Sequence, residues 1–375
     1  MNLKHFDTDT LAEAWLDTQT VDSVAHSIAS NKTFSRKAAN VTGTTNTILP
    51  FSAANTDIGD FIVYDTTDMK YKILKYYGAN PATIGSRYVF GNAVCYKKTP
   101  TGAKFLNSRD LGGIEWAHNF SGGTNYQTIS ANTVVTGYPA ATGTMYANNG
   151  VNTIWHTFVN RTKMQAYLSA SGSDSYVAEG TWPPMKQSTF EGLSSATDAT
   201  QLALYNKYHG SYDEYCIGEM YQYWNDYNKA HHDVDELDLT SKLAGLGQPV
   251  SGDTNYAYPA AATAYNFAET VGTANAAFGA GKWALPSPDS LAAFMYDIPE
   301  AYGDTFSKIN SAFDKIVAAS LSGLTVAKLN ITYHYWSCYE YNSTIAWFYN
   351  GDYGMLNGYD KSYGFRVRPV LALLY

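Results

Sequence analysis

The segment from residue 333 to residue 370 restricts what this chain can form more than any other part of it. It reads YHYWSCYEYNSTIAWFYNGDYGMLNGYDKSYGFRVRPV, and eight of its first 31 residues are tyrosine, whereas the other 344 residues of the chain contain only 24 tyrosines. Tyrosine offers a large, rigid contact area at a small entropic cost, and Ser, Gly and Asn are adaptable hydrogen-bonding groups. We therefore expect a ligand-binding face built from residues 333–365 and held by a rigid framework.

The residues of this segment fall into two sets. The first is a framework of large or chemically specific side chains, of which we expect Trp336, Glu340, Trp347, Arg366 and Arg368 to be the scaffold. The second set contains the positions that we expect to vary and to contact a ligand. Its members are His334, Cys338, Tyr341, Ser343, Thr344, Ile345, Phe348, Tyr349, Asp352, Tyr353, Leu356, Asn357, Tyr359, Asp360, Ser362, Tyr363 and Phe365, together with Gly358 and Gly364.

The second set has a common property in the genetic code. Every member of the second set can be reached from the asparagine codon AAC by changing adenines alone, whereas Trp, Glu, Lys, Gln and Met cannot. Trp336, Glu340, Trp347 and Lys361 fall outside that code, as does Met355.

On these residues the chain resembles the variable proteins of diversity-generating retroelements, whose C-terminal region is rewritten by adenine-directed mutagenesis on a C-type lectin fold. The likeness lies in the YWS…E…AW…G…K…RVRPV pattern at 335–370 and in Trp283, Leu285, Pro286, Ser287 and Leu291 upstream. It implies a C-type lectin fold of the branch that also contains the formylglycine-generating, sulfatase-modifying oxidases.

The rest of the chain predicts a mixed α+β fold. We expect a small N-terminal segment, 1–55, that serves attachment or oligomerisation, then a C-type lectin-fold domain, 56–375, with an insertion around 107–200. The β-branched and aromatic runs at 57–77 and 85–99 predict paired strands. Ser287 and Pro288 predict the start of a helix, a second helix is expected over 303–320, and tyrosines at 205, 208, 212 and 215 indicate a packed helical face.

Composition excludes several classes of function. The formal net charge is −8, so we expect no clustered lysines and arginines that could bind nucleic acid, and no nucleic-acid partner. Cys95, Cys216 and Cys338 have no CxxC spacing, and no catalytic arrangement or metal-ligand set is evident. We therefore expect that the protein is not an enzyme, that it holds no cofactor and no metal, and that it does not insert into a membrane. The start of the sequence shows no signal-peptide pattern.

The resemblance implies a diversified receptor-recognition protein that binds protein or glycan on a host or target cell surface. The absence of a signal-peptide pattern favours a phage virion, at the tail, over a bacterial surface. A monomer and a homotrimer both stay open. Two alternatives also stay open: a calcium-dependent carbohydrate-binding lectin that uses Asp352 and Asp360, and a sulfatase-modifying-type oxidase that uses Cys338.

Overall fold

The structure is a computed structural model that describes residues 25–27, 33–35, 46–76, 86–118, 157–220, 235–245, 257–270, 275–295, 305–319, 324–340 and 344–375. By its contacts the chain divides into two units, Met1–Thr45 and Asn46–Tyr375. In the first unit, β1 (Ala25–Ser27) pairs antiparallel with β2 (Thr33–Ser35). The boundary expected near residue 55 falls inside the second unit, because β3 (Thr47–Pro50) pairs with a strand of its main sheet.

The first sheet of the second unit has the strand order β14-β7-β6-β4-β5-β3. Its strands are β4 (Phe61–Asp65), β5 (Lys70–Lys75), β6 (Tyr88–Lys98), β7 (Gly102–Asn107) and β14 (Val370–Leu374), with β3 at one edge. The paired strands expected from the two apolar runs are confirmed, since β4 pairs antiparallel with β6. The first run is itself a hairpin of β4 and β5.

The second sheet carries the tyrosine-rich segment. Its order is β8-β13-β10-β11-β12-β9, with all neighbours antiparallel except the parallel pair β10 and β13. The strands are β8 (Gly113–Glu115), β9 (Thr157–Phe158), β10 (Tyr335–Glu340), β11 (Ile345–Asn350), β12 (Met355–Asp360) and β13 (Gly364–Arg366). Residues 367–369 lead from this sheet into β14 of the first one.

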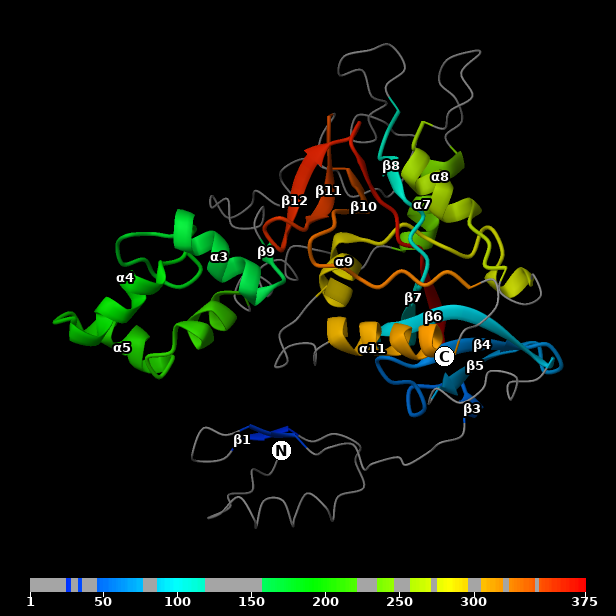
Figure 1. The fold of residues 1–375 in the computed structure, drawn as a ribbon, viewed down its shortest axis with the longest axis horizontal. Helices are drawn as coiled ribbons and strands as arrows, with labels where there is room; N and C mark the ends of the chain where they lie inside the picture. Colours follow the sequence, from blue (N-terminus) through cyan, green and yellow to red (C-terminus); the bar gives the residue numbers. More distant parts are fainter. Residues whose placement is uncertain are drawn as a thin grey trace. The chain divides into compact units, whose positions relative to one another are not determined.

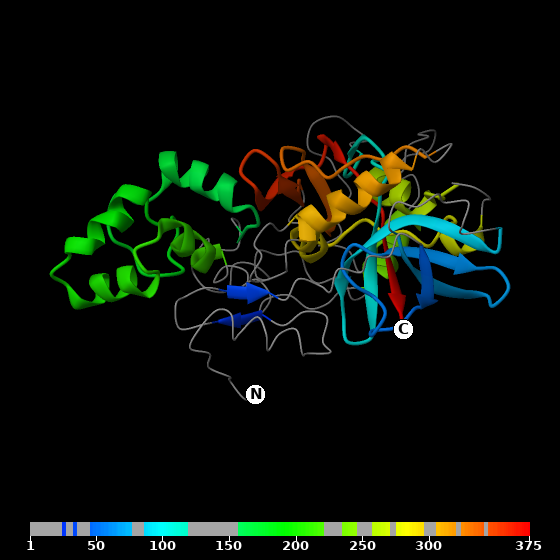
Figure 2. The ribbon, with the colours of Figure 1, turned by 60° about the horizontal axis from the view of Figure 1, so that its bottom comes forward.

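Two helices lie between the sheets (Figures 1 and 2), and both were expected from the sequence. The hydroxyl of Ser287 accepts a hydrogen bond from the Ser290 amide at 3.1 Å, so Ser287 caps α9 (Pro288–Met295) as predicted. This helix contacts β10 and β11 on one side and β6 on the other. The second helix, α11 (Thr305–Ala318), buries Ile309, Phe313 and Ile316 along one stripe.

Residues 161–220 form a lobe of helices, drawn in green in Figures 1 and 2, which begins within the insertion expected around 107–200 and extends beyond it. It comprises α3 (Arg161–Ser171), α4 (Gln187–Gly192), the 3₁₀ turn η3 (Leu193–Ser195), α5 (Ala199–Lys207) and helical residues 212–220. The tyrosine face expected at 205–215 packs inside this lobe, with Tyr215 stacked on Phe190 at 4.8 Å between ring centroids. His209 and Gly210 adopt positive φ and break the helix, so the stretch is not continuous.

The remaining described elements are α7 (Glu236–Gly245), α8 (Pro259–Asn266) and the 3₁₀ turn η4 (Ala276–Phe278). The mixed α+β class is therefore confirmed. Among the helices that the structure describes, none combines the length and the apolar character needed to cross a bilayer.

Candidate ligand-binding face

Six ring-bearing side chains gather on one side of the second sheet. Cross-strand partners point to the same side of a sheet, and the register places Trp336 opposite Phe348. Phe365 of β13 stacks on Phe348 with ring centroids 4.8 Å apart and lies 4.6 Å from Trp336. We call this group the aromatic face; it consists of His334, Trp336, Phe348, Tyr359, Tyr363 and Phe365.

Some rings of the aromatic face are buried in the protein, and others are exposed to solvent. Trp336 and Phe348 are fully buried, whereas Tyr359 and Tyr363 are 40% and 50% exposed. The two tyrosines meet edge to face at 4.6 Å, an arrangement worth about 0.5–1.5 kcal/mol beyond burial. Their outer surfaces are thus held in place by rings that do not themselves reach solvent.

His334 sits at the edge of this cluster. Its ring lies 4.8 Å from that of Phe365, and its Nε2 is 3.7 Å from the carboxylate of Asp352. Burial among the rings lowers the pKa of His334 below its ordinary value, although the Asp352 carboxylate acts in the opposite direction. His334 therefore links the aromatic face to the turn between β11 and β12.

A buried ion pair supports the far end of the same strands. The ammonium of Lys361 donates to the carboxylate of Glu340, and both side chains are completely buried. The ammonium also lies 5.0 Å from the centre of the Trp116 ring. Burial lowers the pKa of Lys361 even though Glu340 favours its charged form. The pair joins the end of β10 to the turn after β12.

The two expected scaffold arginines differ in their surroundings. Arg368 is fully buried and donates to the Ala327 carbonyl oxygen at 2.8 Å. Arg366 is partly exposed; it pairs with Asp110 at 2.7 Å, and its guanidinium lies 3.7 Å from the centre of the Tyr333 ring. Together they fix the passage from the second sheet to β14.

Most of the expected contact positions that the structure describes reach the surface at least in part. Tyr353 is 45% exposed and stands at the β11–β12 turn. The others that are exposed or half-buried are His334, Thr344, Ile345, Asp352, Asn357, Tyr359, Asp360, Ser362, Tyr363 and Phe365. Tyr341 and Ser343 lie outside the described residues.

Four expected contact positions are buried, and for these the expectation of a surface contact is corrected. Tyr349 and Leu356 are register partners on the opposite side of the sheet, where the Tyr349 hydroxyl donates to the Ile331 carbonyl oxygen. Phe348 lies on the correct side but beneath other rings. Cys338 lies where the β10–β11 register shifts, and its amide donates to Pro286. All four have essentially no exposed area.

The two aspartates of the calcium alternative do not converge. Asp352 lies in the turn before β12 and Asp360 ends that strand, so β12 separates them by about 16 Å at roughly 3.3 Å per residue. Calcium requires six to eight oxygens around one point. Within the described ranges, no group of three or more His, Cys, Asp or Glu side chains is placed to hold a metal ion.

The thiol of the oxidase alternative is deeply buried. Burial raises the pKa of Cys338 well above that of a free thiol, so the reactive thiolate is disfavoured. Cys95 and Cys216 are also buried, and all three are free thiols. This arrangement gives the chain no accessible cysteine pair.

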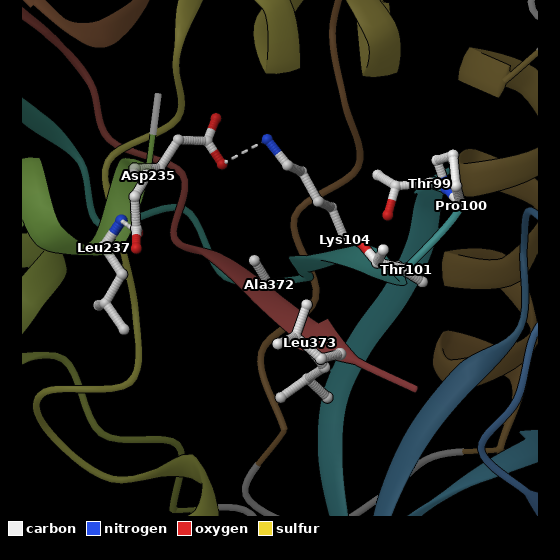
Figure 3. Close-up of a pocket in the computed structure, with 11 residues that line it drawn as sticks. Thr99, Pro100, Thr101, Lys104, Asp235, Leu237, Ala372 and Leu373 are labelled. Carbon is white, nitrogen blue, oxygen red and sulfur yellow. Dashed lines mark hydrogen bonds and ion pairs between the residues drawn. The ribbon is translucent and has the colours of Figure 1, made fainter. Parts of the chain in front are cut away.

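A separate cavity of about 570 Å³ lies between β7, β14 and the start of α7 (Figure 3), and none of the expected contact residues lines it. Lys104 and Leu373 line it, as does the start of α7. Two charged groups at its wall are engaged with each other, since the Lys104 ammonium lies 3.1 Å from the Glu236 carboxylate. The aromatic face is the better candidate for ligand contact.

No family model, curated protein or solved structure matches this chain significantly.

Sequence reasoning missed residues that border the candidate site from outside the tyrosine-rich segment. Tyr167 of α3 meets Tyr353 edge to face at 5.5 Å, and Lys163 of the same helix reaches the Asp352 carbonyl oxygen at 3.5 Å. Their spacing of four residues, one helical turn, indicates that they share a helix face. Only the fold shows that this face of α3 lies against residues 352–354.

Proposed function

We propose that this chain is a diversified ligand-recognition protein with a C-type lectin fold, and that it binds through the aromatic face and the adjoining turns. In this proposal the accessible positions within 334–365 are rewritten between versions of the protein, while the buried framework stays constant. The ligand is a protein or glycan on a target cell, and the setting is a phage virion.

One observation carries the proposal. The described residues of 334–365 that adenine-directed change of AAC cannot produce are Trp336, Glu340, Trp347, Met355 and Lys361, and each is at most 1% exposed. The accessible side chains of the same stretch are all types that such change can produce. Every residue type that such change cannot produce is thus buried in this stretch, although some types that it can produce are buried as well.

The physical properties of the face suit recognition. Exposed tyrosines that rest on sealed rings lose little conformational freedom on binding, so more of the contact energy is kept. Serine, asparagine and aspartate around them add adaptable hydrogen bonds. This combination is typical of antibody-like paratopes.

A display library tests the proposal. The exposed and half-buried positions would be randomised with NNC codons, while Cys338, Phe348, Tyr349 and Leu356 stay fixed. We expect most members to unfold cooperatively near the temperature of the parent chain, and selection on bacterial cells to yield different binders for different strains. A control library would randomise the same number of exposed and half-buried positions in α4 and α5.

Two results would overturn the proposal. One is general unfolding of the first library, and the other is equal yields of binders from both libraries. At the gene level, the proposal expects a near-copy of the 333–370 coding segment with AAC codons close to a reverse transcriptase gene.

A further inference from the structure

The helical lobe is fixed to the turn between β11 and β12. The amides of Val159 and Asn160 both donate to the Gly354 carbonyl oxygen, at 2.9 and 3.2 Å. Gly354 has φ of +64°, and a Cβ added there would lie 2.6 Å from the Cβ of Lys163. Only glycine fits this contact, so α3 and the turn hold one relative position.

That position brings two side chains of α3 to the edge of the proposed site. The Asn160 side chain caps the helix by accepting from the Lys163 amide at 2.9 Å. Lys163 and Tyr167 are one turn apart and share a helix face. Lys163 reaches the Asp352 carbonyl oxygen, and the Tyr167 ring packs edge to face on that of Tyr353.

The surface is continuous from α3 to the aromatic face. The Asp352 carboxylate, which follows the β11 strand, lies 3.7 Å from His334, and His334 packs on Phe365. Phe365 in turn contacts Tyr359 and Tyr363. A ligand that covers the exposed tyrosines at one end of β12 and Tyr353 at the other therefore also reaches α3.

Lys163 supplies a positive charge at this end. Within the described part of the chain its ammonium faces a carbonyl oxygen, and no carboxylate lies within ion-pair distance of it. Two cations next to the aromatic face in the sequence already have carboxylate partners, since Lys361 pairs with Glu340 and Arg366 with Asp110. Lys163 is thus placed to meet a carboxylate that the ligand brings.

We propose that Lys163 and Tyr167 are constant contacts for the ligand, shared by every version of the variable region, and that the ligand is a folded protein with an acidic group at this position. This inference rests on the proposed function. A ligand that touches both ends must span β12, about 16 Å at roughly 3.3 Å per residue. A standard protein interface covers about 800 Å² on each partner, which is enough to do so.

The test uses binders selected from the library of the preceding section, in the full chain, against two purified probes, acidic serum albumin and basic lysozyme. Lys163→Ala and Tyr167→Ala are then introduced into each binder, and Kd is measured by biolayer interferometry. We expect at least a tenfold loss of affinity for most albumin binders. The matched control is Lys186→Ala, a half-buried lysine that pairs with Asp174 within the lobe, which should change Kd by less than twofold.

The outcomes separate the two proposals. If binders arise but Lys163→Ala changes Kd less than twofold in most of them, the constant contact is refuted and the variable face stands. If a folded library gives no binders to either probe, the proposed function itself fails. Tyr167 also packs on Phe158 and Trp182, so circular dichroism of Tyr167→Ala must first show that the lobe is still folded. If it is not, the affinities of Lys163→Ala alone decide the question.

Discussion

The buried pair of Glu340 and Lys361 gives the sharpest test of the framework. Replacing Lys361 with methionine keeps most of the side-chain volume but leaves the Glu340 carboxylate without its cation in a site closed to water. Removing one partner of a buried ion pair costs about 3–5 kcal/mol, because the remaining charge is uncompensated. We expect Lys361→Met to lower the free energy of unfolding by that amount.

The double variant Glu340→Met/Lys361→Met separates loss of the pair from loss of packing. Replacing a buried pair by apolar side chains of similar volume is often neutral, so we expect it to recover stability to within about 1 kcal/mol of the parent. Urea unfolding followed by tryptophan fluorescence measures all three chains. The control is Lys242→Met, which breaks an exposed pair with Asp238 and should cost about 0.5 kcal/mol or less.

The reasoning is refuted if Lys361→Met unfolds at the urea concentration of the parent chain. It is also refuted if the double variant is no more stable than Lys361→Met, because the defect would then lie in packing against Trp116 and not in the unpaired charge.

Three further predictions concern the same region. Phe348→Ala should cost about 3–5 kcal/mol in urea unfolding because it opens a cavity, whereas Tyr363→Ala should cost only about 0.5–1.5 kcal/mol because it loses mainly the edge-to-face contact with Tyr359; similar values would contradict the division between buried support and exposed contact. The lowered pKa of His334 means that the unfolded chain binds a proton more readily, so the stability from this residue is complete above pH about 6.5 and is lost as the pH falls. The melting temperature of the parent should thus drop relative to His334→Asn between pH 7.5 and pH 5, and a constant difference would count against this. Gly354→Ala should destabilise by roughly 1–3 kcal/mol from its left-handed backbone and close contacts, whereas Gly192→Ala meets open space and should be neutral or stabilising; equal effects would argue against the tight turn.

Local signals in the sequence predicted the mixed α+β class and several individual elements. The cap at Ser287 and the apolar stripe of α11 are encoded within a few residues, so they could be read without knowing the tertiary structure. The tyrosines on Phe190 were also expected to pack, because steps of three and four put them on one helix face.

The candidate site was predicted less completely, for a physical reason. The codon pattern reports which residue types occur, but not which side of a strand each one faces. Tyr349 and Phe348 are adjacent and belong to the same set, yet they point to opposite sides, and only their pairing with β12 reveals it. Helix α3 gave a weak signal because only Met164 and Leu168 are buried along it.

The last strand, β14, follows the region proposed to change but lies in the other sheet of the unit. Val370 pairs with Leu106, and Leu371 is buried in the core of that sheet. A version of the gene that gained or lost a base during rewriting would be translated without this strand, and β7 would be left with a bare edge. A version with a shifted reading frame would therefore fail to complete the first sheet, and only versions with an intact reading frame would fold.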